Sequence, residues 1–121
     1  MKILIADDEE RIVDILRKFL ESKGLRVDYA LDGKKVLDLI KEQDYDIVFL
    51  DINMPELTGF EILRYVKDNK MRVKVVFLTG YPCVDEKFCK TLRVDEYLEK
   101  PVDLKVIEEI VVKYKLEGGK K

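Results

Sequence analysis

Acidic, amine and hydroxyl side chains follow directly after four short apolar runs of this chain. Asp7 and Asp8 follow the first run, and Asp51 follows the second. Thr79 ends the third run, and Lys100 comes after the fourth. If the runs are parallel strands, their carboxyl ends share one edge of a sheet, where ligands bind in open α/β folds. Carboxylates, a hydroxyl and an amine at one edge are the groups needed to hold a divalent cation and to receive a phosphoryl group.

The acids at this edge predict a cation site. Carboxylates about 4 Å apart repel each other by several kcal/mol at an intermediate dielectric, and a cation removes that repulsion. Oxygen ligands of this hard kind favour Mg²⁺ or Mn²⁺. Alone, each residue has an ordinary explanation: Asp8 as a helix N-cap, Asp51 as a turn acid, Lys100 as a surface lysine. The combination, with each member at a strand end, points to chemistry.

The elements that must position these residues alternate regularly. Short apolar runs predict strands, and recurring apolar residues at helical spacing predict helices. The expected strands lie near 2–6, 26–30, 46–50, 74–78 and 95–98, and the expected helices lie near 9–23, 34–42, 58–69, 84–91 and 103–116. This alternation predicts an α/β fold, a three-layer sandwich with a parallel sheet and right-handed crossovers.

The length and composition fit one domain over residues 1–116, with 117–121 as a flexible tail or linker stub. The net charge of −2 gives no broad basic surface for nucleic acid. No apolar stretch approaches the roughly 20 residues that a membrane-spanning helix needs. We therefore expect a cytoplasmic protein that binds neither nucleic acid nor membrane through this domain.

The motifs together resemble the receiver domain of two-component response regulators, including the chemotaxis type. The residues that carry the resemblance are Asp7-Asp8, the segment 51–59, Thr79-Gly80 and the segment 97–101. The resemblance covers essentially all of the 121 residues. It implies a flavodoxin-like fold with five helices and a five-stranded parallel sheet in the order 2-1-3-4-5.

The resemblance also implies a role for each acid. Asp51 becomes the phosphorylation site, accepting the phosphoryl group from a phosphohistidine of a sensor histidine kinase or phosphotransfer protein. Asp8, Asp51 and the backbone carbonyl of Asn53 ligate Mg²⁺ or Mn²⁺, and Asp7 acts mainly through a bound water. The catalytic set is Asp51 with Lys100 and Thr79. The domain assists its own phosphorylation and dephosphorylation but is a signalling phosphoacceptor rather than an enzyme.

Other matched residues are expected to bind the phosphoryl group and to report its presence. Lys100, the Thr79 hydroxyl and the Gly80 amide bind phosphoryl oxygens, and a cis bond to Pro101 aims Lys100. Thr79 and the aromatic Tyr97 form the switch, with Tyr97 moving inward as Thr79 engages the phosphoryl group. The result is a change of conformation that controls an output or partner.

Several positions set this chain apart from other members of that family. Many members carry Gly-Ala where this chain reads Arg93-Val94, which puts the detail of the switch in question. Asn53 and Tyr81 are expected to tune hydrolysis of the phosphoaspartate, Asn53 by placing a water and Tyr81 by screening the phosphoryl group.

A second apolar stripe on the last predicted helix suggests a contact surface. Val106 and Ile110 flank the stripe that faces the core. They are candidates for a homodimer or effector interface near the last strand and its flanking helices. The alternative is that both simply pack against the preceding helix.

Four other functions are weighed against the leading one. A phosphatase of the haloacid dehalogenase class usually carries Asp-x-Asp, whereas Asn53 stands second after Asp51. A flavodoxin-like cofactor binder would need a phosphate loop after the first strand, where this chain is acidic. A binding module that works without phosphorylation is disfavoured by the complete residue set. A phosphorelay intermediate, returning the phosphoryl group from Asp51 to a partner histidine, remains open.

Overall fold

The computed structural model describes residues 1–80 and 93–118. Its five strands form one parallel sheet in the order β2-β1-β3-β4-β5, which confirms the expected topology. The strands are β1 (Lys2–Ala6), β2 (Arg26–Ala30), β3 (Ile47–Asp51), β4 (Lys74–Thr79) and β5 (Glu96–Glu99). The helices are α1 (Glu10–Ser22), α2 (Gly33–Glu42), α3 (Gly59–Asp68) and α5 (Leu104–Gly118). The helix expected over 84–91 lies outside the described residues.

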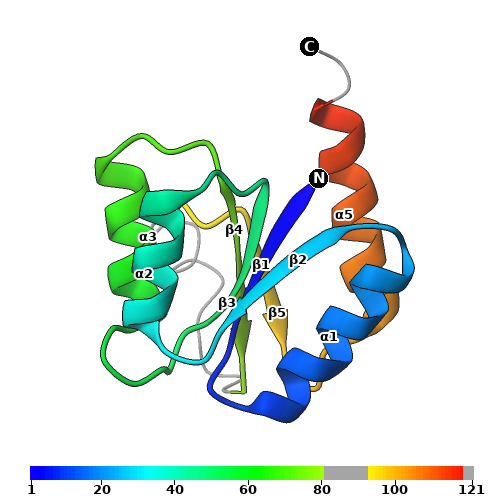
Figure 1. Cartoon of the computed structure of the whole chain (residues 1–121), viewed down its shortest axis with the longest axis horizontal. Helices are drawn as coiled ribbons and strands as arrows, with labels where there is room; N and C mark the ends of the chain where they lie inside the picture. The colour runs from blue at the N-terminus through cyan, green and yellow to red at the C-terminus, as the bar shows by residue number, and fades with distance from the viewer. Residues whose placement is uncertain (81–92, 119–121) are drawn as a thin grey trace.

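Helices cover both faces of the sheet (Figure 1): α2 and α3 lie on one face, and α1 and α5 on the other. Side chains of a strand point alternately to the two faces. In β1, Leu4 therefore joins the core on the α2–α3 side, whereas Ile3 and Ile5 join the core on the α1–α5 side. The central strands β3 and β4 are buried along nearly their whole length, as their continuous apolar runs predict.

The helix ends carry residue types that commonly begin and end helices. The Thr58 hydroxyl accepts the Glu61 amide N–H at 3.3 Å and so caps α3. Gly24, at φ 81°, stands just beyond α1, as a C-terminal glycine should. Helix α5 ends later than expected: it continues through Glu117 to Gly118, two residues beyond 116. A helix-stopping residue first occurs at Gly118, so propagation past Leu116 is reasonable.

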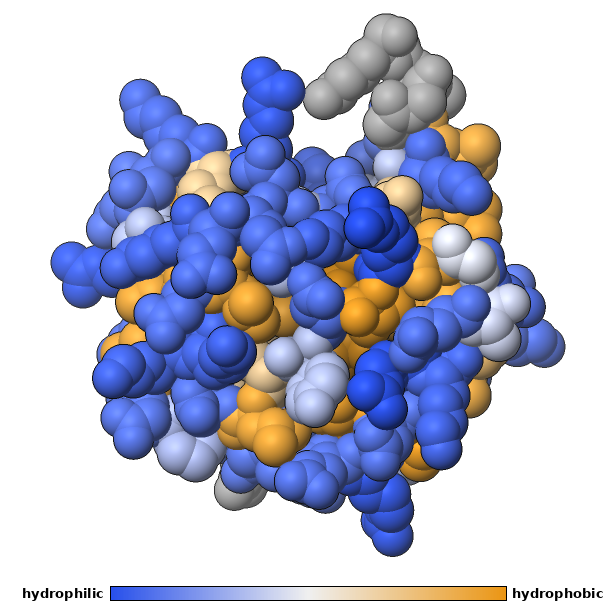
Figure 2. Space-filling model, in the orientation of Figure 1, coloured by the Kyte–Doolittle hydropathy of each residue, from blue (hydrophilic) through white to orange (hydrophobic). Residues whose placement is uncertain are grey.

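Hydrophilic residues cover most of the face of the molecule that Figure 2 shows. Apolar residues are visible between them. The exposed large apolar residues of the described chain include Ile15 on α1, at 50%, and Leu116 on α5, at 63%. Within residues 1–80 and 93–118, each helix is too short or too polar to cross a membrane.

Candidate functional site

The sheet places the predicted acids side by side at the carboxyl ends of its central strands. Ala6 of β1 pairs with Leu50 of β3, so the next residues, Asp7 and Asp51, emerge at neighbouring positions. Carboxylate oxygens of Asp7, Asp8 and Asp51 all lie within 4.8 Å of one another. Asp7 is fully buried and Asp51 is 5% exposed, whereas Asp8 faces solvent.

This arrangement suits a hard cation. The three carboxylates offer oxygen ligands at one spot, and the exposed Asp8 leaves that spot accessible from solvent. Among the described residues, Lys100 is the basic residue that forms ion pairs with Asp7 and Asp51, so one ammonium group offsets only part of the charge of the three carboxylates. A divalent ion would relieve the remaining repulsion.

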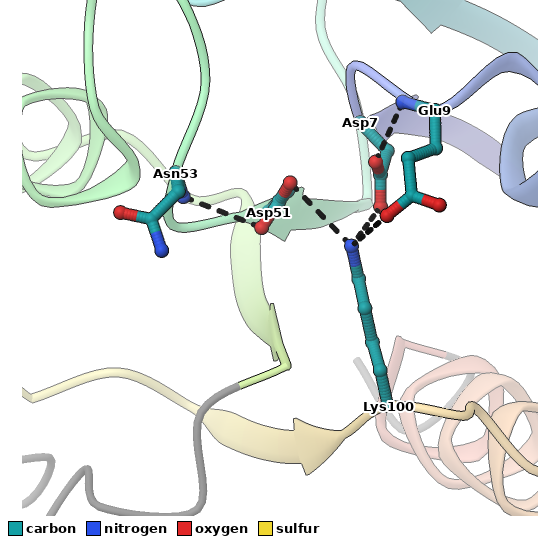
Figure 3. A network of polar contacts seen from close by, with 5 residues as sticks. All are labelled: Asp7, Glu9, Asp51, Asn53 and Lys100. Carbon is teal, nitrogen blue, oxygen red and sulfur yellow. Dashed lines mark hydrogen bonds and ion pairs between the residues drawn. The ribbon is translucent and has the colours of Figure 1, made fainter.

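Lys100 reaches into this cluster from the end of β5 (Figure 3). Its Nζ lies 2.8 Å from Asp7 Oδ2 and 3.5 Å from Asp51 Oδ2. Its backbone N–H donates to the Thr79 carbonyl at 2.6 Å, which ties it to the end of β4. The Lys100–Pro101 peptide bond is cis, as the family resemblance implied. The lysine is thus fixed at both its backbone and its ammonium group.

Burial and neighbouring charges shift the pKa of both partners. Burial, together with the Asp7 and Asp8 charges, raises the pKa of Asp51 to about 6, against the opposing effects of Lys100 and the Asn53 amide. For Lys100, burial lowers the pKa, but the hydrogen bond to Asp7 and the nearby carboxylates outweigh it, so the pKa is raised overall. The ionised form of Asp51 is therefore disfavoured in the folded domain, whereas Lys100 stays charged.

The loop after Asp51 is held by close backbone contacts. The Asn53 N–H donates to Asp51 Oδ1 at 3.3 Å, while the Asn53 side chain is exposed. A Cβ on Gly59 would lie 2.9 Å from the Asp51 carbonyl oxygen, and one on Gly33 would lie 2.1 Å from that of Leu57. The two glycines thus allow helices α3 and α2 to approach this loop, which fixes the position of the acid.

The residues expected to respond to phosphorylation lie on the strands next to Asp51. Thr79 is buried at the end of β4, and Gly80, beyond it, is exposed. Tyr97 pairs in register with Phe77 and packs half-buried against the core on the α2–α3 side. Arg93 has φ 59°, a left-handed conformation that explains why glycine suits this position. Tyr81 lies outside the described residues.

The interface hypothesis for α5 needs a correction. Ile110 is 5% exposed and belongs to the core shared by α1, α5 and the sheet, and Val106 is half-buried against the same core. The second apolar stripe therefore widens the buried face of α5 instead of forming an outer patch. The exposed large apolar residues of α5 are Val112, at 49%, and Leu116.

One member of the polar network escaped the sequence reasoning. Glu9 Oε1 lies 3.6 Å from Lys100 Nζ, beside Asp7 (Figure 3). The Glu9 backbone N–H donates to Asp7 Oδ1 at 2.9 Å, which turns the chain so that the Glu9 side chain can reach the lysine. The sequence does carry a signal, because Glu9 is the third consecutive acid after β1. An acid at the start of a helix is, however, ordinarily explained by its favourable interaction with the helix dipole.

Comparison with known proteins agrees with this geometry. The family model of the response regulator receiver domain matches residues 3–112. The chain belongs to this family. Its curated relatives include the response regulator SaeR of Staphylococcus epidermidis, 38% identical over 100 residues that make up 82% of this chain and 43% of SaeR. The chain thus spans less than half the length of the curated relatives it matches.

Solved receiver structures superpose over nearly the whole chain. A CheY-like receiver domain from Methanospirillum hungatei is 27% identical, with a TM-score of 0.87 over 99% of this chain and 98% of that one. The response regulator TrrA of Thermotoga maritima, solved in complex with Mg²⁺-BeF, is 31% identical, with a TM-score of 0.83 over 93% of this chain and 97% of TrrA. The fold and the family of the chain are therefore those of a phosphoacceptor receiver domain.

Proposed function

We propose that Asp51 is the phosphoacceptor and that a sensor histidine kinase or phosphotransfer protein is the donor. The carboxylate of Asp51 attacks phosphorus as the phosphorus–nitrogen bond of the donor phosphohistidine breaks. The observation that carries the proposal is a buried carboxylate placed between two further acids and a lysine at the end of a central strand. Because burial disfavours the ionised form of Asp51, transfer of its negative charge to an electrophile is favourable.

A divalent cation completes the proposed site. Asp8, Asp51 and the Asn53 carbonyl are the proposed direct ligands of Mg²⁺, or Mn²⁺, with Asp7 acting through water. The clustered carboxylate oxygens support this assignment. Bound there, the cation neutralises oxygen charge during phosphoryl transfer. The Mg²⁺-BeF complex of TrrA adds support by analogy.

The lysine and the hydroxyl complete the proposed catalytic set. Lys100, already 3.5 Å from Asp51, binds one phosphoryl oxygen through its ammonium group. Thr79 donates its hydroxyl to another oxygen, and the Gly80 amide assists. Tyr97 then moves further inward, and β5 with its flanking helices transmits the change. This is a local change of charge that biases a two-state element.

Two residues are proposed to set the lifetime of the phosphoaspartate. Asn53 orients an attacking water, and the exposure of its side chain to solvent supports this role. Tyr81, two positions after Thr79, screens the phosphoryl group, so that Tyr81→Ala shortens the lifetime measured by loss of the phosphorylated mass. An unchanged or longer lifetime would count against this role.

The proposed setting is a cytoplasmic signalling pathway. The domain itself acts as a phosphoacceptor with no separate substrate to turn over, and its output is an effector or a second copy reached through β5 and the helices beside it. Of the two residues first assigned to that surface, Val106 keeps some exposure. A phosphorelay, in which Asp51 passes the group to a partner histidine, uses the same acceptor.

Intact mass after incubation with acetyl phosphate and Mg²⁺ tests the acceptor. One added phosphoryl group is expected on the native chain, and none on Asp51→Asn or without the metal. Asp38→Asn, an exposed acid on α2, is the matched control and should accept the group normally. The absence of any adduct, even with beryllofluoride as mimic, would favour a module that binds its partner without phosphorylation.

A further inference from the structure

Glu9 differs from the other carboxylates around Lys100 in its exposure. The side chains of Asp7 and Asp51 are 0% and 7% exposed, whereas that of Glu9 is 56% exposed. Its carboxylate lies 3.6 Å from Lys100 Nζ, close to the 3.5 Å distance from Asp51. Glu9 is thus a solvent-facing competitor for the same ammonium group (Figure 3).

The backbone around Glu9 keeps this competitor in place. Because the Glu9 N–H is bound to the buried Asp7, its Cα cannot move away from the site without breaking that hydrogen bond. The side chain, in contrast, contacts Lys100 from the solvent side and can rotate away. A fixed backbone with a movable carboxylate permits exchange of Lys100 between Glu9 and an incoming anion.

Glu9 also adds to the charge of the site. Three carboxylates, those of Asp7, Asp51 and Glu9, form ion pairs with the ammonium group of Lys100. The Asp8 carboxylate adds a further negative charge beside Asp7 and Asp51. The negative charge of Glu9, beside Lys100, attracts a cation to the site and repels an anion from it. The exposure of Glu9 limits both effects, since solvent and salt screen its charge.

We propose that Glu9 is a positioning residue that holds Lys100 in the unphosphorylated state and sets the balance between cation and phosphoryl binding. The inference rests on the proposed function of Asp51. Glu9 favours Mg²⁺ and opposes the phosphoryl group, and Lys100 leaves Glu9 when a phosphoryl oxygen takes its place. A carboxylate that only begins helix α1 has neither of these effects.

The test measures two affinities in Glu9→Gln, which keeps the shape and removes the charge. Calorimetry with Mg²⁺ alone should show affinity about threefold weaker than in the native chain. Titration with beryllofluoride, in Mg²⁺ that saturates each variant, should show affinity about threefold stronger. Opposite shifts for cation and anion separate this role from a loss of structure, which weakens both.

Two further variants sharpen the test. Glu10→Gln removes the same charge one residue further along α1 and should change either affinity by less than about 1.5-fold. Glu9→Asp keeps the charge but shortens the side chain away from Lys100, so it should preserve Mg²⁺ affinity and still strengthen beryllofluoride binding.

The outcomes are distinguishable. Equal effects of Glu9→Gln and Glu10→Gln, or shifts of the same sign for both ligands, would overturn the role of Glu9. Native behaviour of Glu9→Asp toward both ligands would overturn competition for Lys100. In each of these outcomes, the proposed function still stands if the native chain binds Mg²⁺ and beryllofluoride. Failure of the native chain to bind either ligand would refute the proposed function itself.

Discussion

Lys100 is held more closely by Asp7 than by Asp51, the proposed acceptor. Its Nζ lies 2.8 Å from Asp7 Oδ2 and 3.5 Å from Asp51 Oδ2. Asp7 is fully buried, so its charge depends on this lysine and on the Glu9 N–H for compensation among the described contacts. The lysine therefore has a structural duty to Asp7 in addition to its proposed part in phosphoryl transfer.

Lys100→Met should destabilise the metal-free fold by about 1–3 kcal/mol, because it leaves the buried Asp7 carboxylate without its cation. Urea denaturation at pH 7.5 measures the loss, and added Mg²⁺ should restore part of it by supplying a cation nearby. Lys105→Met, at an exposed position of α5, is the control and should change the free energy of unfolding by less than about 0.5 kcal/mol. Equal losses in the two variants would show that Asp7 does not need Lys100.

The raised pKa of Asp51 makes its ionised form unfavourable in the fold. Burial and the Asp7 charge raise the pKa from an unfolded value of 3.8 to about 6. When the pKa of an acid is higher in the folded state than in the unfolded state, ionisation of its carboxylate disfavours folding. This penalty disappears as the pH falls from above 6 to below 4. The penalty amounts to at most roughly 3 kcal/mol.

Asp51→Asn should therefore stabilise the metal-free domain at pH 7.5, by roughly 1–3 kcal/mol, and the gain should shrink steadily toward pH 4.5. Urea denaturation of both proteins across this range, in chelator, measures it. With saturating Mg²⁺ the gain should also shrink, because the cation stabilises the native carboxylate. A gain that is constant with pH would mean that Asp51 titrates at its ordinary value.

The position of the acids was predictable because it depends on features that a sequence displays directly. Continuous apolar runs end at Asp7 and Asp51, parallel pairing brings their ends to one edge, and short loops leave little freedom. The cis bond before Pro101 was implied by the family resemblance, and the structure contains it. The placement of the acids arises from local pattern and topology, so it needs no knowledge of side-chain packing, whereas the cis bond was available only through the resemblance.

Features that depend on packing were less accessible. Helical spacing showed that Ile110 flanks the main stripe of α5, but only the placement of α5 on the sheet beside α1 shows that both stripes are covered. The Glu9 contact depends on how one side chain folds back, which spacing does not encode. The close approach of the loop after Asp51 to α2 was likewise not predictable from local sequence. The requirement for glycine at position 33 comes from the backbone of Leu57, which is far away in the chain.

Gly33→Ala should disturb the loop that follows Asp51. A Cβ at position 33 would lie 2.1 Å from the backbone carbonyl oxygen of Leu57, so either the loop or the start of α2 must move. The expected loss of stability is about 1–3 kcal/mol, with weaker Mg²⁺ binding because the loop carries Asn53. Urea denaturation and Mg²⁺ calorimetry check the two effects. Gly80→Ala, with open space around the added methyl group, should stay within about 0.5 kcal/mol of the native chain.

Arg93 adopts a left-handed backbone conformation just before β5, at φ 59°, and its side chain is exposed. This conformation costs a non-glycine residue roughly 1–2 kcal/mol, whereas glycine adopts it readily but loses more entropy on folding. Arg93→Gly should therefore raise the free energy of unfolding by about 0.5 kcal/mol, and the β-branched Arg93→Val should lower it by about 1 kcal/mol. Urea denaturation of both variants measures the difference. Arg72→Gly, an exposed position outside the left-handed region, should be destabilising, so stabilisation by glycine at both sites would argue against strain at Arg93.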